Sequence, residues 1–361
     1  MTKVVVAHPV AARLSSSIAV TKCMSEVAPT GIQWLWPGLL AKGKLSLIVG
    51  DPGQSKSTLI AALTAHITRG KPWPDDSECP SGSVILASAE DDPQDTIRPR
   101  LDAAGADPSR VHLLEHVLGV DGQREHFGLG HVEELDRLLA ATRDVQMVSI
   151  DPISAYMGQT DTHRNSDVRG LLAPLCAVAA KHRVSLIAVS HLNKGSSAAA
   201  IYRTTGSLGF VAAARACLLV ATPEDQPDVR YLLPVKNNLA PMGSGISYRI
   251  CTTDAGVPYV EWIPGSIDMS ADEALTASPA EETSATRDCV KWLSLLLSPG
   301  PKAAKAVLAE AEEYGFTPKV VRRARERLGI EPRKADFREG WIWALRAAGQ
   351  DAPVVEDAQH S

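Results

Sequence analysis

Residues 50–57 read Gly-Asp-Pro-Gly-Gln-Ser-Lys-Ser, and this turn constrains the fold more than any other segment. An apolar, strand-forming run at 45–49 precedes it, and a helical pattern at 58–64 follows. A strand, a glycine-rich turn ending in Lys-Ser and a helix form the context of a phosphate-binding P-loop, where backbone N–H groups and the helix N-terminus bind phosphate. The predicted ATP contacts are Gly50, Asp51, Pro52, Gly53, Gln54, Ser55, Lys56, Ser57 and Thr58.

Two side chains of this turn have specific predicted roles. Lys56 would reach the β and γ phosphates, and the Ser57 hydroxyl would hold Mg²⁺. Ser55 stands where the pattern has its second glycine, and a Cβ atom there crowds the backbone near the phosphates. Serine is small and its hydroxyl can donate to a phosphate oxygen. We therefore interpret Ser55 as a variation tolerated by an active site, against the alternative of a degenerate one.

Further apolar strands follow the P-loop. They are predicted at 83–87, 145–150, 184–189 and 216–220, with helical patterns between them, for example at 132–141 and 168–180. This alternation predicts an α/β fold with a mostly parallel central sheet covered on both faces. After Val220, strands at 230–235, 246–250 and 259–263 follow one another without helices, which predicts an antiparallel extension of the same sheet.

The chain of 361 residues is long enough for one large domain and a smaller one. Residues 1–30 are predicted to be a flexible leader and residues 31–263 the main domain. Residues 264–284, rich in Asp, Glu, Ala, Ser and Thr, are predicted to be a linker. Three helical patterns and a short β-like stretch predict a winged helix-turn-helix at 285–347, followed by a disordered tail at 348–361.

The composition indicates the cellular compartment in which the protein is expected. No apolar run approaches the roughly 18–20 residues that span a bilayer, so no membrane partner is expected. The six cysteines lie far apart and form no C-x-x-C pair, which suggests neither a zinc site nor a disulfide framework. These features fit a cytoplasmic protein.

Polar residues follow three of the predicted strands. Glu90 comes after the strand at 83–87, Asp151 after 145–150 and His191 after 184–189. Because ligands bind at the carboxyl ends of parallel strands, these side chains are expected near the P-loop. Asp151 would hold Mg²⁺ through water, Glu90 would activate the attacking water, and His191 would contact the γ-phosphate. Each position alone has a structural explanation, and their joint occurrence favours catalysis.

The order of these motifs resembles the RecA/DnaB-like ATPases, and most closely the hexameric RepA-type replicative helicases of plasmids and other mobile elements. The segments at 32–38, 99–105, 190–194 and 234–238 strengthen the resemblance, which covers about residues 30–263. It implies that Lys56 and Ser57 bind nucleotide, Glu90 is the catalytic base, Asp151 serves Mg²⁺ and His191 is the sensor.

The resemblance also implies a homo-oligomeric ring, hexameric in this family, with a cation supplied across each subunit interface. Such a cation raises the rate by several orders of magnitude in related chemistry. Lys236 and Arg203 are the favoured candidates, ahead of Arg215 and Arg100. DnaB-like proteins have Lys-x-Arg at the first position, whereas this chain has Lys236-Asn237-Asn238 and lacks the arginine.

Two segments are predicted to contact DNA. The loop at 193–206 would face the ring channel, where Lys194 and Arg203 neutralise phosphates of single-stranded DNA and Tyr202 stacks on a base. The alternative is a loop that only covers the nucleotide. In the second unit, residues 317–347 hold nine Lys/Arg and four Asp/Glu, with Lys319, Arg322 and Arg323 on one predicted helix. This excess of positive charge favours duplex DNA as the partner of the second unit, and a protein partner is the alternative.

Two classes of function remain. The first is an ATP-hydrolysing motor that moves on DNA, as in a RepA-type replicative helicase. The second is an ATP-gated DNA-binding regulator or recombination mediator that does not unwind, which Ser55 and the missing arginine would suit. A kinase of small molecules is a weaker alternative, because no substrate lid is recognisable in the sequence.

Overall fold

The computed structural model describes residues 21–119, 121–158, 165–192, 208–223, 225–277, 284–298, 300–330, 332–334 and 341–345. Among these residues, no helix is long and apolar enough to cross a bilayer. Residues 1–20 of the predicted leader, the predicted loop at 193–206 and the predicted tail at 348–361 lie outside the described residues. The predictions made for Lys194, Tyr202 and Arg203 therefore fall outside them as well.

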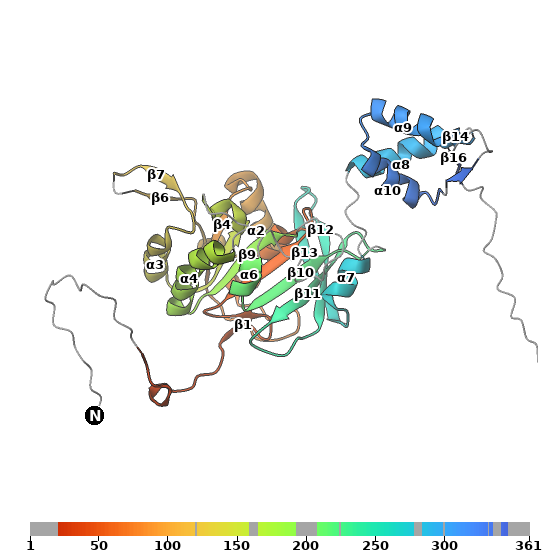
Figure 1. The fold of residues 1–361 in the computed structure, drawn as a ribbon. Coiled ribbons are helices and arrows are strands. Elements are labelled where there is room, and N and C mark those ends of the chain that lie inside the picture. The colour runs from red at the N-terminus through yellow and green to blue at the C-terminus, as the bar shows by residue number, and fades with distance from the viewer. Residues whose placement is uncertain are drawn as a thin grey trace, which may run out of the picture.

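Nine strands of the described chain form one large sheet in the order β13-β12-β11-β10-β3-β9-β8-β4-β5 (Figure 1). The strands from β10 to β5 in this order are parallel, and β11, β12 and β13 add an antiparallel extension. Their bounds are β3 Leu45–Gly50, β4 Ser83–Ser88, β5 Val111–Leu113, β8 Val145–Asp151, β9 Ser185–His191, β10 Ala216–Ala221, β11 Val229–Asn237, β12 Gly245–Thr252 and β13 Pro258–Ile267. The predicted α/β fold with a mostly parallel sheet is confirmed.

Helices cover both faces of this sheet. The first face carries α1 and α2, and the second carries α3, α4, α6 and α7. Their bounds are α1 Lys56–Arg69, α2 Arg98–Ala104, α3 Val132–Ala141, α4 Asn165–His182, α6 Leu208–Ala213 and α7 Ala271–Ala277. Short elements connect them: η1 Met24–Glu26, β1 Trp34–Trp36, β2 Leu40–Ala41, η2 Pro93–Ile97, η3 Pro108–Arg110, β6 His116–Leu118, β7 Arg124–His126 and η4 Ile153–Tyr156.

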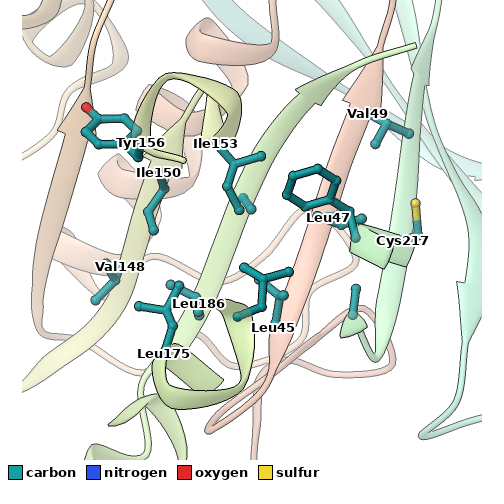
Figure 2. Close-up of a cluster of buried hydrophobic side chains, with 14 of the residues drawn as sticks. Leu45, Leu47, Val49, Val148, Ile150, Ile153, Tyr156, Leu175, Leu186 and Cys217 are labelled. Carbon is teal, nitrogen blue, oxygen red and sulfur yellow. The ribbon is translucent and has the colours of Figure 1, made fainter. Parts of the chain in front are cut away.

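The central strands are buried on both sides, which explains why they appear in the sequence as continuous apolar runs. In β3, Leu45, Leu47 and Val49 face the cluster under α4 and α6, whereas Ile48 faces the cluster under α1. Figure 2 shows the first of these clusters, where the β3 side chains share a face with Leu186 of β9. Each fully buried Leu or Ile contributes roughly 1.5–3 kcal/mol. This packing fixes the strand ends that carry the polar residues.

The prediction of a linker at 264–284 was wrong for residues 264–277. Strand β13 continues to Ile267, and α7 packs against β10 and β11 with Ala271 and Ala274 each only 5% exposed. The composition lacks large apolar residues, but alanine allows a short helix to lie close to a sheet and still remove apolar surface from water. Of the remaining residues of the predicted linker, 278–283 lie outside the described residues, and Ser284 begins α8.

The C-terminal unit has its own small core. Its elements are α8 Ser284–Leu297, β14 Lys302–Ala303, α9 Ala304–Glu313, α10 Pro318–Arg327, β15 Arg333–Lys334 and β16 Trp341–Trp343. The strands form an antiparallel sheet in the order β14-β16-β15. Leu293 of α8, Val307 of α9, Val321 of α10 and Trp343 of β16 are buried together. Three helices and a β stretch were predicted here, whereas β14 was not.

Candidate nucleotide-binding site

The turn between β3 and α1 has a constrained backbone. Gly50 ends β3, and a Cβ atom there would lie 2.7 Å from the carbonyl oxygen of Val220 in β10, so only glycine fits. Gly53 has a φ of +79° and Ser55, the N-cap of α1, has a φ of 59°. This left-handed conformation costs a non-glycine residue roughly 1–2 kcal/mol. The serine in place of the second glycine therefore adds backbone strain to the turn.

Lys56, the first residue of α1, is only 6% exposed and points back into the turn. Its Nζ donates to the carbonyl oxygens of Gly50, at 2.9 Å, and Asp51, at 2.8 Å. The Nδ1 atom of His191 lies 3.3 Å from the same Nζ. An ammonium held at the end of a strand and at the N-terminus of a helix is placed to exchange these carbonyls for phosphate oxygens.

Ser57 and Asp151 meet beside Lys56. The Ser57 hydroxyl donates to Oδ2 of Asp151 at 2.7 Å, so the first turn of α1 and the end of β8 are joined directly. A hydroxyl and a carboxylate in contact form the oxygen donor set that a hard cation such as Mg²⁺ prefers. The residues present therefore fit the predicted magnesium site.

The electrostatic environment of Asp151 also fits a magnesium site. Burial is the largest effect and raises the pKa of Asp151, while the Ser57 hydrogen bond and the Lys56 charge lower it. The nearby carboxylates of Asp91 and Glu90 raise the pKa of Asp151 further. Because burial and like charges disfavour the ionised carboxyl, a bound cation would stabilise it.

Glu90 is exposed at the end of β4, next to β8 in the sheet. Ser88 is the register partner of Asp151, and Ala89 N donates to the Asp151 carbonyl at 3.1 Å, so Glu90 follows directly beside Asp151. The loop behind it is well anchored. Asp91 pairs with Arg100 of α2 at 2.6 Å, and the Asp92 carboxylate accepts from the backbone of η2. An exposed carboxylate on an anchored loop is available to a water molecule.

His191 ends β9, which lies between β3 and β8. Its register partner is Gly50, so the imidazole stands at the mouth of the P-loop beside Lys56. The structure thus brings Lys56, Ser57, Glu90, Asp151 and His191 together at the carboxyl ends of four neighbouring strands. This is the grouping that the strand-end pattern predicted.

Of the candidate trans-acting cations, Arg203 lies outside the described residues, Arg100 lies next to the site, and Lys236 lies beside the start of β10, away from the P-loop. Lys236 donates from Nζ to the carbonyl oxygens of Val211, at 2.6 Å, and Ala214, at 2.8 Å, at the end of α6. Burial lowers the pKa of Lys236. Arg100 pairs with Asp91, and Arg215 is exposed. Lys236 thus stabilises a helix C-terminus within its own chain.

Sequence reasoning missed two contacts of this site. The Thr222 hydroxyl, just after β10, donates to Oε1 of Gln54 in the P-loop. A polar residue after a buried strand was the signal used for the other strands, and the same signal at Thr222 would have identified it. The Asp91–Arg100 pair has no comparable signal, because it depends on how η2 turns the chain back toward β4.

The cations of the C-terminal unit that were predicted to contact DNA lie on α10. Arg322 and Arg323 are exposed, and Arg322 pairs with Glu326 one turn later at 3.0 Å. Lys319 lies in the first turn of the same helix. Arg325 is half-buried and lies over the ring of Trp343, 5.4 Å from its centroid. The helix therefore has one structural arginine and a separate exposed basic side.

A known protein family matches the part of the chain that carries the first of these sites. Residues 14–197, just over half of the chain, match the model of an AAA domain family, a RecA-like group of P-loop ATPases. The chain belongs to this family, and the matched span includes Lys56, Glu90, Asp151 and His191.

The chain is also similar to the DNA repair protein RadA of Bacillus subtilis (strain 168), with 26% identity over 162 residues. This stretch is 45% of the chain and 31% of RadA, so the chain spans about a third of that relative's length.

Proposed function

We propose that this protein is a DNA-stimulated ATPase that works as a ring-shaped motor, of the kind that RepA-type replicative helicases represent. The observation that carries the proposal is the meeting of Lys56, Ser57, Asp151 and His191, with Glu90 beside them, at neighbouring strand ends. A chain that only bound phosphate would not need the exposed carboxylate and the histidine at these two positions.

The proposed mechanism assigns one task to each side chain. The P-loop N–H groups and Lys56 would bind the phosphates of ATP, and Ser57 and Asp151, which share a hydrogen bond, would hold Mg²⁺. When bound, Mg²⁺ supplies positive charge to the β and γ phosphate oxygens. Glu90 accepts a proton from the attacking water, for which its exposed position is suited. His191 touches both Lys56 and the region of the γ-phosphate, so that it can report hydrolysis to the loop that follows β9.

DNA binding is assigned to two places. The loop at 193–206 follows His191 directly, and Lys194, Tyr202 and Arg203 are proposed to grip single-stranded DNA in the ring channel. In the C-terminal unit, the order α8-β14-α9-α10-β15-β16 supports a winged helix-turn-helix. Its α10 would approach duplex DNA with Lys319, Arg322 and Arg323. Arg203 of a neighbouring subunit is the preferred trans-acting cation, since Lys236 already holds the end of α6.

A second candidate function is an ATP-gated recombination mediator that binds DNA without unwinding it. The similarity to a protein named for DNA repair favours it, and so does the engagement of Lys236 within its own chain. The two candidate functions share the ATPase site. They differ in whether ATP hydrolysis drives DNA unwinding or only controls DNA binding.

Strand displacement on a forked DNA duplex, measured with ATP and Mg²⁺, separates these candidates. The motor requires displacement by the full chain and its loss in Lys56→Ala, while the exposed-lysine control Lys71→Ala unwinds normally. DNA-stimulated hydrolysis without displacement would favour the mediator. Background hydrolysis in the presence of DNA would remove both.

A further inference from the structure

The edge of the sheet opposite the nucleotide site is basic. There the parallel strands β10, β3, β9 and β8 begin, as neighbours in that order. Six lysines and arginines lie at these strand starts and form what we call the basic edge: Lys42, Lys44, Arg143, Lys181, Arg183 and Arg215. The same segments, 42–44, 142–144, 181–184 and 213–215, contain one acidic residue, Asp144. Because the whole chain has a net charge of -5, the basic edge is a local excess of positive charge.

Backbone hydrogen bonds hold these strand starts side by side. The amide of Arg215 donates to the first residue of β3 at 2.8 Å, and the amide of Gly43 donates to Val184, just before β9, at 2.8 Å. Burial raises the pKa of the Cys176 thiol in α4, and the charges of Arg215 and Lys44 lower it, so both cations lie near this residue. Neighbouring strands lie about 4.8 Å apart, so the row from β10 to β8 is about 14 Å long.

Most charges of the basic edge are available to a ligand. Arg143, Arg183 and Arg215 are exposed and form no ion pair within the part of the chain that the structure describes. Lys181 differs, because it pairs with Asp136 of α3 at 2.6 Å. The exposed arginines therefore present charge to solvent that no carboxylate of the described chain neutralises.

A polar cavity of about 310 Å³ lies within the basic edge. Its lining includes Lys42, His182, Arg183 and Asp144. The Lys42 Nζ donates to Oε1 of Gln146, a neutral amide that leaves the positive charge uncancelled. Charged N–H donors that converge on a cavity of this size suit the oxygens of a phosphate group.

The residue types of the basic edge favour duplex DNA over other partners. The core of a protein interface is depleted in charged residues, and single-stranded DNA is held by aromatic stacking. The aromatic side chains classed as exposed among the described residues, Tyr314 and Trp341, belong to the C-terminal unit, and none of the exposed large apolar residues lines the cavity. A duplex presents its phosphates on the outside of a stiff rod, which cations alone can contact.

We propose that the basic edge binds the phosphate backbone of duplex DNA and that the cavity at Lys42 takes one phosphate. A row of about 14 Å spans about four base pairs of the helix axis. Contacts of this kind position the duplex and carry no sequence information. The inference rests on the proposed DNA partner of this protein, and it adds a contact to those assigned to the loop at 193–206 and to α10.

Fluorescence anisotropy of the full chain with a short labelled duplex, at several salt concentrations, tests this surface. The test variant combines Arg143→Gln, Arg183→Gln and Arg215→Gln, which remove three exposed charges and keep polar side chains. Each phosphate contact contributes about 0.9 to the slope of log affinity against log salt, so the slope should become shallower by about 2–3. The affinity should fall by roughly a hundredfold, and a duplex of unrelated sequence should give the same result.

A matched control variant loses the same number of charges elsewhere. It combines Arg124→Gln, Arg137→Gln and Arg249→Gln, at exposed positions of β7, α3 and β12, and should bind the duplex like the wild type. Equal midpoints of urea unfolding show that lost binding is not lost folding. If the test variant is less stable, each of its single substitutions should still lower the slope by about one.

Three results would refute parts of this proposal. Equal DNA binding by the test and control variants would overturn the basic edge as a DNA surface. A changed oligomeric state of the test variant in sedimentation, with DNA binding unchanged, would also overturn it and assign this edge to a contact between copies. A wild-type chain that binds no duplex would refute the proposed DNA partner itself, which is a separate failure.

Discussion

The nucleotide site and the C-terminal unit hold their charged groups in different ways. At the nucleotide site, Lys56 is buried among carbonyl oxygens, and Ser57 and Asp151 share a hydrogen bond across two elements. On α10, Arg322 and Arg323 lie in solvent, and the ion pair of Arg322 with Glu326 is a surface pair within one helix. Surface pairs of this kind contribute little stability and are screened by salt.

This difference determines what a substitution can do. A group at the nucleotide site, buried as Lys56 is or exposed as Glu90 is, acts through its position, so its loss is expected to remove a step of the chemistry. An exposed cation on α10 acts through the summed charge of the surface, so its loss removes only one part of the total attraction to DNA phosphates. The nucleotide site should therefore show effects of orders of magnitude, and the C-terminal unit effects of a few fold.

The largest effect is expected for Glu90→Gln. The amide retains the shape of the side chain and cannot accept a proton from water, so kcat for ATP hydrolysis should fall by roughly 10²–10⁴-fold while nucleotide affinity is retained. Steady-state hydrolysis and equilibrium binding measure the two quantities. The exposed Glu115→Gln variant is the matched control. A Glu90→Gln enzyme with near-normal kcat would show that this carboxylate is not the base.

A smaller effect is expected for Arg323→Ala on α10. Loss of one phosphate contact should weaken duplex DNA binding by roughly fivefold and reduce the slope of log affinity against log salt by about one. Fluorescence anisotropy at several salt concentrations measures both. Lys305→Ala, at an exposed lysine of α9, should leave both unchanged. Identical behaviour of the two variants would favour a protein partner for this unit.

Ser55→Gly should alter stability more clearly than catalysis. Relief of the left-handed strain is offset in part by the greater backbone entropy of glycine, which leaves a gain of roughly 0.5–1 kcal/mol in the free energy of unfolding. Hydrolysis should stay within about tenfold, or ~1.4 kcal/mol. Urea unfolding is the measurement. Asp76→Gly, with a φ of 61° outside the turn, should give a comparable gain and normal hydrolysis. A much larger gain in rate for Ser55→Gly would show that the native P-loop is impaired.

The smallest expected effect is that of Asp151→Asn on the free energy of unfolding in the absence of Mg²⁺. Because burial raises the pKa of this carboxyl, its contribution to stability is present below the unfolded pKa and is lost as pH rises through the folded pKa. The free energy of unfolding of Asp151→Asn should thus increase relative to that of the wild type as the pH is raised from acidic to neutral. Urea unfolding in EDTA measures this difference. Added Mg²⁺ should stabilise the wild type alone. A difference that stays constant with pH would contradict the assignment of the shift to burial.

The parts that the sequence predicted are those with a local signal. Long apolar runs identified the central strands, and polar residues after them identified Glu90, Asp151 and His191, because parallel strands must end at a common edge. Helix α7 was missed because alanines bury little surface each and their composition is typical of linkers. The place of α7 against β10 and β11 depends on tertiary packing alone.

Contacts between distant side chains were also beyond sequence reasoning. The Thr222–Gln54 bond joins residues 168 positions apart. Lys236 was predicted to act across a subunit interface, and the structure shows it at the end of α6, where a cation satisfies helix carbonyls. A motif alone does not distinguish these two environments.

The central claim is that the edge of the sheet at Lys56 hydrolyses ATP in a manner coupled to DNA. Its most direct test is the steady-state rate of ATP hydrolysis by the full chain with Mg²⁺, measured with and without single-stranded DNA. The account predicts turnover that rises on addition of DNA and disappears in Lys56→Ala under both conditions. A rate that stays at background with DNA present, or that survives in Lys56→Ala, would contradict it.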